Sequence, residues 1–241
     1  MNLVVDIGNS RVKLALFNER DLLFQVPLEE LHVSQLKLLT EEHPRLSRAI
    51  ISAVREYPQE VRDFLHKHFH AFIEFGPQVA VPLKNRYKTP ETLGPDRLAA
   101  AVGATVLFPG KNLLVIDAGT AVTYDLITRT EEYLGGNISP GLYTRFRALH
   151  AYTGRLPLVA PRNDFLPLGE DTESAIRAGV QQGLLFEAEQ TIRCFSDRYA
   201  PLTVVLTGGD ASFLEKHLNL LVFVRNNLAL FGLNRILEYN C

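Results

Sequence analysis

The order of apolar and polar residues in the N-terminal stretch predicts three short strands joined by tight turns. Leu3 to Ile7 is apolar except for Asp6, and the next residues, Gly8-Asn9-Ser10, are typical of a turn. Between Val12 and Leu16, apolar side chains alternate with polar or small ones, which indicates a half-buried strand. Residues 21–26 supply a third strand, so we expect an antiparallel meander.

Helices and strands then alternate, and the whole order begins again in the second half. In the first half we expect helices over residues 28–42, 58–69 and 96–108 and a buried strand over 49–54. After a breaker cluster at 109–112 we expect strands at 113–117, 122–127, 132–139, 204–206 and 220–224, with helices at 143–150, 171–195, shortly after 206 and up to 238. This repeat predicts two related domains, residues 1–110 and 111–241.

The first strand of each half ends in the same kind of turn. Asp6-Ile7-Gly8-Asn9 is echoed by Asp117-Ala118-Gly119-Thr120. A triphosphate needs close backbone N–H groups, and glycine permits that approach because it has no Cβ. One copy alone is better interpreted as a plain hairpin, whereas two copies at equivalent places favour phosphate binding. Two such turns facing each other across a cleft would clamp one nucleotide.

The side chains beside these turns suit a nucleotide and its counter-ions. Asn9, Ser10 and Thr120 can donate hydrogen bonds to phosphate oxygens, and Lys13 on the second strand can reach the β- and γ-phosphates as a point charge. The aspartate of each turn supplies a carboxylate that can hold a cation near those phosphates. A carboxylate at a buried strand end is costly unless it has a partner, which favours a functional role.

The amino-acid composition mainly excludes certain classes of protein and of site. The chain has 241 residues, of which 46% are hydrophobic and 22% charged, with a formal net charge of −2 and a pI of about 6.4. These values are ordinary for a globular enzyme and lack the basic excess of a nucleic-acid binder. Two distant cysteines, Cys194 and Cys241, indicate neither a disulfide framework nor a zinc site. With no signal peptide and no apolar stretch long enough to span a bilayer, we expect a soluble cytoplasmic protein that binds no membrane.

A second segment with candidate chemistry is Gly94-Pro95-Asp96-Arg97, at the start of a predicted helix. One interpretation is structural, because an acidic residue in the first helical turn stabilises the helix dipole by about 0.3–1 kcal/mol. The other is functional: a kinase that acts on an alcohol needs a carboxylate to accept the hydroxyl proton, and an arginine can bind a substrate carboxylate. Spacing alone does not separate the two.

Five stretches together resemble the motifs of one family. The paired turns are similar to the phosphate motifs of the actin, sugar kinase and Hsp70 superfamily, and the chain resembles the type III pantothenate kinases along nearly its whole length. The matching stretches are Asp6 to Lys13, Gly94 to Arg97, Asp117 to Thr123, Gly135 to Gly141 and Thr207 to Asp210. The resemblance implies an α/β fold of two ribonuclease H-like (actin-like ATPase) domains, each a mixed sheet with a three-strand antiparallel meander and flanking helices.

The resemblance also implies ATP-dependent phosphorylation of pantothenate to 4′-phosphopantothenate, the first step of coenzyme A biosynthesis. It implies that Asp96 is the general base, that Asp117 holds a monovalent cation, K⁺ or NH₄⁺, and that Mg²⁺ accompanies ATP. The implied ATP contacts are Asp6, Ile7, Gly8, Asn9, Ser10, Arg11, Val12, Lys13 and Thr120. The implied pantothenate contacts are Tyr87, Gly94, Pro95, Asp96, Arg97 and Thr172, the last of them across the interface of a homodimer.

Several alternatives stay open. By sequence alone, Thr172 is better interpreted as a first-turn helix residue beside a capping Asp171. Small residues recur at every fourth position of the same helix, at Ala175, Gly179 and Gly183. They suit close approach by another helix, either from the same chain or from a partner. The loop at 153–169 either covers the cleft or is a passive connection. The rival functions are another kinase or phosphatase of the superfamily, and a non-catalytic regulator that has kept a kinase fold.

Overall fold

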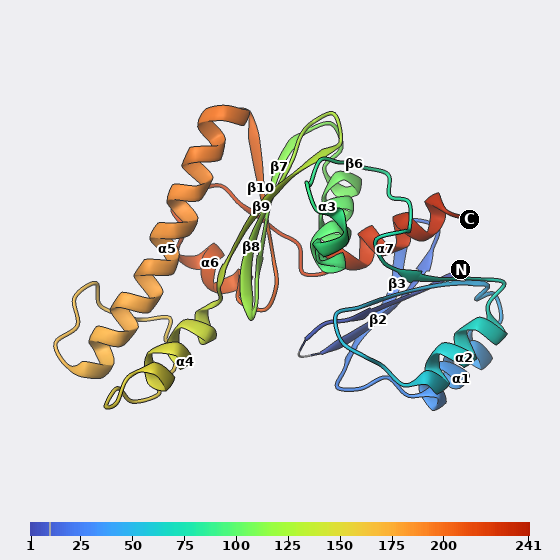
Figure 1. Ribbon diagram of the computed structural model, residues 1–241, viewed down its shortest axis with the longest axis horizontal. Helices are drawn as coiled ribbons and strands as arrows, with labels where there is room; N and C mark the ends of the chain where they lie inside the picture. Colours follow the sequence, from blue (N-terminus) through green and yellow to red (C-terminus); the bar gives the residue numbers. More distant parts are fainter. Residues whose placement is uncertain (10) are drawn as a thin grey trace. The chain divides into compact units, whose positions relative to one another are not determined.

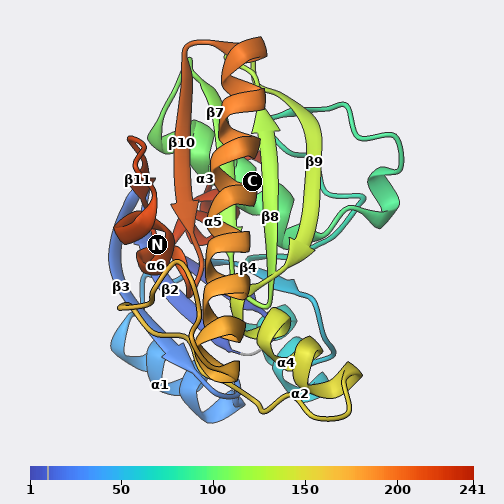
Figure 2. The same cartoon turned by 90° about the vertical axis from the view of Figure 1, so that its left-hand side faces the viewer.

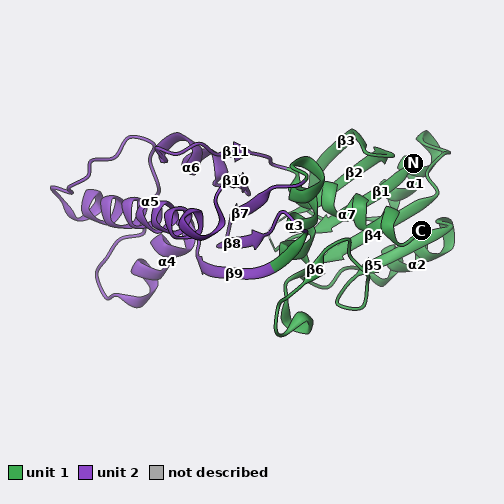
Figure 3. Cartoon of the chain, turned by 90° about the horizontal axis from the view of Figure 1, so that it is seen from above, with its two compact units in different colours: residues 1–109, 131–133, 227–241 green, residues 110–130, 134–226 purple. Residues whose placement is uncertain are grey.

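The computed structural model describes residues 1–9 and 11–241, so Ser10 lies outside the described residues. The chain divides into two compact units, which Figure 3 colours separately. Unit 1 consists of residues 1–109, 131–133 and 227–241, and unit 2 consists of residues 110–130 and 134–226. The last helix of the chain therefore belongs to unit 1. The predicted domains, residues 1–110 and 111–241, stay a prediction.

Unit 1 contains the predicted meander. Its five strands are β1 (Asn2–Ile7), β2 (Val12–Asn18), β3 (Asp21–Leu28), β4 (Arg48–Ala53) and β5 (Ala71–Phe75). They lie in the order β3-β2-β1-β4-β5. β1 and β2 pair antiparallel, as do β2 and β3, whereas β4 is parallel to both β1 and β5. The edge strand β5 was not predicted, because its five residues carry little alternation of their own.

The helices of unit 1 lie on both faces of this sheet, as Figure 1 shows. Helices α1 (Val33–Glu42) and α2 (Gln59–His68) bury the face that carries Leu3, Val5 and Ile7. Helices α3 (Pro95–Leu107) and α7 (Leu228–Tyr239) contact β1 and β4 from the other face. Because side chains alternate along a strand, Asn2, Val4 and Asp6 must point to that second face. Two smaller elements, β6 (Lys84–Asn85) and a 3₁₀ turn (Pro90–Thr92), precede α3.

Two glycines allow α3 and α7 to pack closely. A Cβ on Gly103 of α3 would lie 1.9 Å from the carbonyl oxygen of Leu228. A Cβ on Gly232 of α7 would lie 1.8 Å from the carbonyl oxygen of Ala99. Neither distance is possible for a real side chain, so any larger residue would push the helix backbones apart. This close crossing fixes α3, whose first turn carries Asp96.

Unit 2 repeats the strand order of unit 1. Its strands are β7 (Asn112–Ala118), β8 (Ala121–Ile127), β9 (Glu132–Pro140), β10 (Leu202–Thr207) and β11 (Phe223–Val224). The sheet order is β11-β10-β7-β8-β9, extended by β6, which pairs with the first residues of β9. β7 pairs antiparallel with β8 and parallel with β10. The first strand thus lies between its hairpin partner and a parallel strand, as β1 does in unit 1.

Three helices bury one face of the unit 2 sheet. They are α4 (Leu142–Tyr152), α5 (Thr172–Tyr199) and α6 (Ala211–His217), and Figure 2 shows α5 in front of the sheet, running along the strands. Leu114, Ile116 and Tyr124 of the sheet pack against Phe146 of α4 and Leu184 of α5. Although α5 is long, no helix in the described ranges is both long and apolar enough to cross a membrane.

Both units contain a sheet with parallel and antiparallel pairs, covered by helices, which confirms the predicted α/β class with two mixed sheets.

Candidate active site

Asp6 is the second-last residue of β1, the middle strand of the unit 1 sheet, and the first turn follows that strand. Asp6 lies directly opposite Lys13 on β2 and opposite Ser52 on β4. Residues that face each other across neighbouring strands share one face of the sheet. The three side chains therefore point toward the layer formed by α3 and α7. Asp6 is only 9% exposed and Ser52 only 1%, so this polar group is inside the protein.

The surroundings of Asp6 shift its pKa in both directions. Burial raises the pKa of Asp6 from its ordinary value of 3.8 to about 6, while the Lys13 ammonium lowers it and the Asp96 carboxylate raises it. Asp96 affects Asp6 only because the first turn of α3 lies near the end of β1. Two residues from distant parts of the sequence, Asp6 and Asp96, are thus brought together with Lys13.

The backbone of the first turn is fixed by short contacts. The Gly8 N–H donates to the Arg11 carbonyl at 3.0 Å, and the Val54 N–H donates to the Ile7 carbonyl at 3.0 Å. A Cβ on Gly8 would lie 3.2 Å from the Arg11 oxygen, so a larger residue would require a small shift of the turn. The side chain of Arg55 donates from Nε to the Gly8 carbonyl at 3.2 Å. Beside Val12, which is buried, the side chains of Asn9 and Arg11 are exposed.

The segment at the head of α3 agrees with the structural interpretation of the sequence, while the functional one stays a prediction. Gly94 is the N-cap, Pro95 opens the helix, and Asp96 accepts a hydrogen bond from the Arg97 backbone N–H at 2.9 Å. The carboxylate therefore stabilises the first turn, as the structural interpretation predicted. It also acts electrostatically on Asp6, which helix capping alone would not require.

Arg97 and Tyr87 lie side by side. Arg97 is only 6% exposed, and its guanidinium carbon lies 5.8 Å from the centre of the Tyr87 ring, within the range of a cation–π contact. The Tyr87 ring lies 6.2 Å from the Tyr133 ring, and its backbone N–H donates to Asn85 Oδ1 at 2.9 Å. Unit 1 thus places Tyr87 beside Arg97, whereas Thr172, the remaining predicted substrate residue outside the segment at the head of α3, belongs to unit 2.

The second turn, in unit 2, is built differently from the first. Asp117 is the second-last residue of β7 and is half-buried, and the Gly119 N–H donates to the Ala121 carbonyl at 2.9 Å. The exposed Thr120 accepts two hydrogen bonds at its carbonyl, from the Gly141 N–H at 3.0 Å and from Thr144 Oγ1 at 2.6 Å. The turn is therefore tied to the start of α4.

A glycine turn after β10 packs directly against Asp117. Gly208 has φ +93°, which favours glycine, and a Cβ there would lie 2.4 Å from Asp117 Oδ1 and 2.3 Å from the Ala118 oxygen. The Asp210 N–H donates to the same Ala118 carbonyl at 2.9 Å. Burial raises the pKa of Asp210. Unit 2 thus gathers two carboxyl-bearing residues and a bare backbone at one end of its sheet.

Thr172 is the first residue of α5 and is exposed. The preceding Asp171 caps the helix by accepting a hydrogen bond from the Ser174 N–H at 2.8 Å, and that bond lowers the pKa of Asp171. The capping interpretation is thus correct for Asp171. A Cβ on Gly179 or Gly183 would meet no heavy atom of the described chain within 4 Å.

The loop at 153–169 is fastened to α5 along its length. The fully buried Gln181 donates to the Arg162 carbonyl at 2.7 Å and accepts from the Arg162 N–H at 3.0 Å. Gln182 donates to the Pro167 carbonyl at 2.6 Å. Gly169 approaches so closely that a Cβ there would lie 2.2 Å from the Ala175 Cα. These contacts favour a passive connection over a moving cover.

Two polar residues near Asp6 were missed in the sequence. Ser52 Oγ is buried and has no hydrogen-bond partner among the described residues. Arg55 was missed because it follows β4 without any motif, although it contacts the first turn. Aligning β4 with β1 would have found Ser52, because the parallel pairing places it beside Asp6.

Comparison with known proteins points to one family. The family model for type III pantothenate kinases matches residues 2–194. A type III pantothenate kinase of Christiangramia forsetii is 42% identical over 241 residues, covering 100% of this chain and 99% of the relative.

Two solved structures share the fold at lower identity. A protein of Campylobacter jejuni assigned to the Baf family of transcriptional activators has a TM-score of 0.64 at 22% identity, covering 99% of this chain and 98% of that one. A protein of Listeria monocytogenes assigned as an N-acetylmannosamine kinase has a TM-score of 0.55 at 12% identity, covering 99% and 98%. Both show the fold alone, and the kinase neighbour agrees with the predicted ribonuclease H-like domains. By its family match and its full-length relative, the chain belongs to the type III pantothenate kinase family.

Proposed function

We propose that the protein transfers the γ-phosphoryl group of ATP to the primary hydroxyl of pantothenate, giving 4′-phosphopantothenate in the first step of coenzyme A biosynthesis. The observation that carries this proposal is the proximity of Asp96 to Asp6 and Lys13 in a chain of this family. A carboxylate for the hydroxyl proton and an ammonium for the phosphates are the charges that phosphoryl transfer to an alcohol needs.

The proposed chemistry assigns one task to each group. Asp96 accepts the proton as the pantothenate oxygen bonds to the γ-phosphorus, and the bond from that phosphorus to the departing ADP oxygen breaks. Lys13 faces the phosphates as a point charge. Arg97 binds the pantothenate carboxylate, and its contact with Tyr87 holds the guanidinium in place. Gly94 and Pro95 contribute by shaping the first turn of α3.

The proposed ATP contacts are Asp6, Ile7, Gly8, Asn9, Ser10, Arg11, Val12 and Lys13 in the first turn and Thr120 in the second. Support comes from the tight Gly8 turn and from the exposed side chains of Asn9 and Arg11. The two hydrogen bonds described for Thr120 are accepted by its backbone carbonyl and do not involve its side chain. The hydroxyl of that side chain can therefore donate to a phosphate oxygen. That both turns bind the same triphosphate stays a prediction.

Two cations belong to the proposal. Mg²⁺ prefers one or two carboxylates together with phosphate oxygens, and the buried Asp6 beside Asp96 fits that preference. For K⁺ or NH₄⁺ we assign Asp117, because its carboxylate lies against the backbone of Gly208 at the end of the sheet, close to the turn that carries Asp210. When bound, the cations supply positive charge that neutralises the phosphates.

The same proposal includes a homodimer in which Thr172 contacts the pantothenate of the partner subunit. Its support is the exposed position of Thr172 at the head of α5 and the bare backbone at Gly179 and Gly183. We also propose a cytoplasmic location, where ATP and the intermediates of coenzyme A synthesis are available. With a net charge of −2, the chain gives no reason to include a nucleic acid among its partners.

The test is an ADP-release assay with pantothenate as acceptor, run with and without potassium. We expect turnover that depends on pantothenate, and a loss of about 10²–10⁴-fold in kcat for Asp96→Asn with ATP binding unchanged. Asp197→Asn, an exposed aspartate on α5, is the matched control and should be unaffected. Full turnover by Asp96→Asn would remove the base assignment. Turnover with acetate, a sugar or polyphosphate in place of pantothenate would favour a different kinase of the superfamily.

A further inference from the structure

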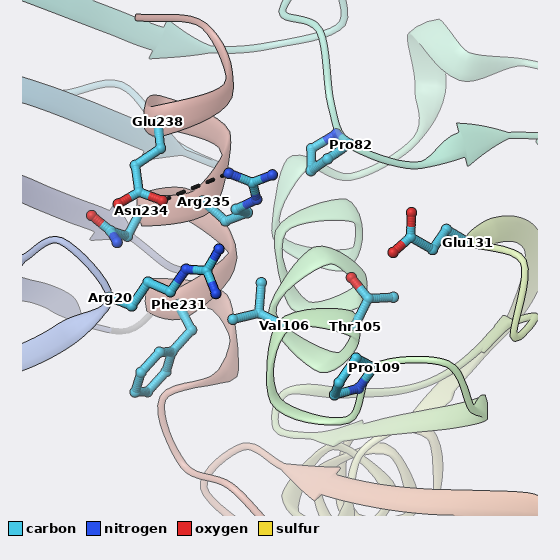
Figure 4. A pocket seen from close by; sticks show the side chains of 10 residues that line it. All are labelled: Arg20, Pro82, Thr105, Val106, Pro109, Glu131, Phe231, Asn234, Arg235 and Glu238. Carbon is cyan, nitrogen blue, oxygen red and sulfur yellow. Dashed lines mark ion pairs between the residues drawn. The ribbon is translucent and has the colours of Figure 1, made fainter.

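A cavity of about 230 Å³ lies in unit 1 at the opposite end of α3 from Asp96. Thr105 and Val106, in the last turn of α3, line it, and Arg235 of α7 faces it from the other side (Figure 4). Asp96 and Thr105 are nine residues apart on one helix, which separates them by about 14 Å. The cavity is therefore not part of the site around Asp6 and Asp96.

One wall of the cavity carries two guanidinium groups, with Asn234 and the Glu238 carboxylate beside them. Arg20, from the turn between β2 and β3, and Arg235 both extend into it in Figure 4. Among the described residues Arg20 has no hydrogen bond or ion pair, and Arg235 reaches only Glu238, at 3.7 Å, which is beyond hydrogen-bond distance. Each guanidinium carries five N–H donors, and no hydrogen bond among the described residues uses those of Arg20 or Arg235, so this wall has donors available for an anionic group.

The opposite wall offers only acceptors. The carboxylate of Glu131 points into the cavity in Figure 4, and no partner for it occurs among the described residues. Thr105 already donates its hydroxyl hydrogen to the Val102 carbonyl at 2.8 Å, so its oxygen can only accept. A molecule that satisfies both walls needs an anionic group at one end and a donor, best a cation, at the other.

The backbone around the cavity is held in place before any ligand arrives. Among the described residues, two non-glycine residues have a positive φ: Glu19 (φ +52°) and Glu131 (φ +59°). Glu19 directly precedes Arg20, and Glu131 itself lines the cavity. The buried Asn234 donates to the Glu19 carbonyl at 2.7 Å, and Lys84 donates its N–H to the Glu131 carbonyl at 2.8 Å. Conformations of this kind persist only where the surroundings fix them.

We propose that this cavity binds a small amino carboxylate, with the carboxylate on Arg20 and Arg235 and the ammonium on Glu131 and Thr105. Arginine pairs suit carboxylates because the planar fork can donate two parallel hydrogen bonds. The apolar side chains of Val106 and Phe231 then contact the methylene groups between the two charged ends. The volume admits only a short ligand, since the pockets that bind drug-sized ligands measure about 300–1,000 Å³.

Glycine, β-alanine and 4-aminobutyrate are the probes, because they carry the same two charges at increasing separation. Binding is followed by backbone amide NMR and by calorimetry on the whole chain. We expect one of the three to shift the amides of Thr105, Val106 and Glu131 in a saturable way. Butyrate and butylamine, which each lack one charge, should bind at least about tenfold more weakly, the effect of one charge-assisted hydrogen bond.

Variants locate the site and guard against binding elsewhere. Arg20→Gln, Arg235→Gln and Glu131→Gln should each weaken binding about tenfold or more, whereas Arg193→Gln, an exposed arginine on α5, should not. Thermal unfolding confirms that each variant is folded. No saturable shift with any probe, or wild-type affinity in the Arg20 and Glu131 variants, would overturn the proposal. Equal affinity for butyrate would overturn the assignment of an ammonium to Glu131.

Discussion

Replacing Asp6 by asparagine should stabilise the protein against unfolding at neutral pH, although it removes a residue of the proposed ATP site. Burial holds the pKa of Asp6 at about 6, above the ordinary value of 3.8 that it regains on unfolding. The folded protein therefore binds the proton more tightly than the unfolded chain does. As pH rises from about 4 to 6, the unfolded chain ionises first and the free energy of unfolding falls.

The size of the effect follows from the two pKa values. Integrating the proton linkage gives a destabilisation by Asp6 of about 1 kcal/mol at pH 4.5 and about 3 kcal/mol at pH 8. An asparagine carries no such penalty at either pH. For a chain of this length, 1 kcal/mol corresponds to roughly 2–4 °C in Tm. Asp6→Asn should therefore melt several degrees higher than the wild type at pH 8 and closer to it at pH 4.5.

Calorimetric melting curves at both pH values, without nucleotide, measure this difference. Asp197→Asn serves as the control, because that exposed aspartate should give no pH-dependent advantage. In an Asp96→Asn background the advantage of Asp6→Asn should shrink, since the Asp96 charge contributes to the raised pKa. An advantage of equal size at pH 4.5 and pH 8, or one matched by Asp197→Asn, would refute the reasoning.

Three further substitutions test residues of unit 1 and of unit 2. Ser52→Ala should leave stability within about 1 kcal/mol, since no described residue hydrogen-bonds the hydroxyl, yet it should lower kcat/KM about tenfold by removing a donor beside Asp6. A large drop in Tm would indicate a structural role instead. Arg97→Lys should raise KM for pantothenate about 10- to 100-fold with little change in KM for ATP, and an unchanged KM for pantothenate would contradict the assignment. Gly208→Ala should lower the free energy of unfolding by at least about 2 kcal/mol, because of its φ and the approach to Asp117, and weaken potassium dependence; calorimetry and potassium titration check both.

The sequence by itself determined the local elements. Alternation along Val12 to Leu16 and the Gly8 turn define the hairpin that the structure contains, because side-chain period and turn chemistry act within a few residues. The same holds for the helix that begins at Pro95 and for the cap of α5 by Asp171. The repeated order of strands was visible for the same reason.

Only the tertiary structure decided which of these residues meet. Asp6 and Asp96 are far apart in the chain, and their coupling depends on the crossing of α3 and α7, which two glycines permit. The buried Ser52 beside Asp6 follows from the parallel register of β4 with β1, which no local pattern encodes. Pairing between distant segments is decided by how whole faces pack, because each segment alone is compatible with many partners.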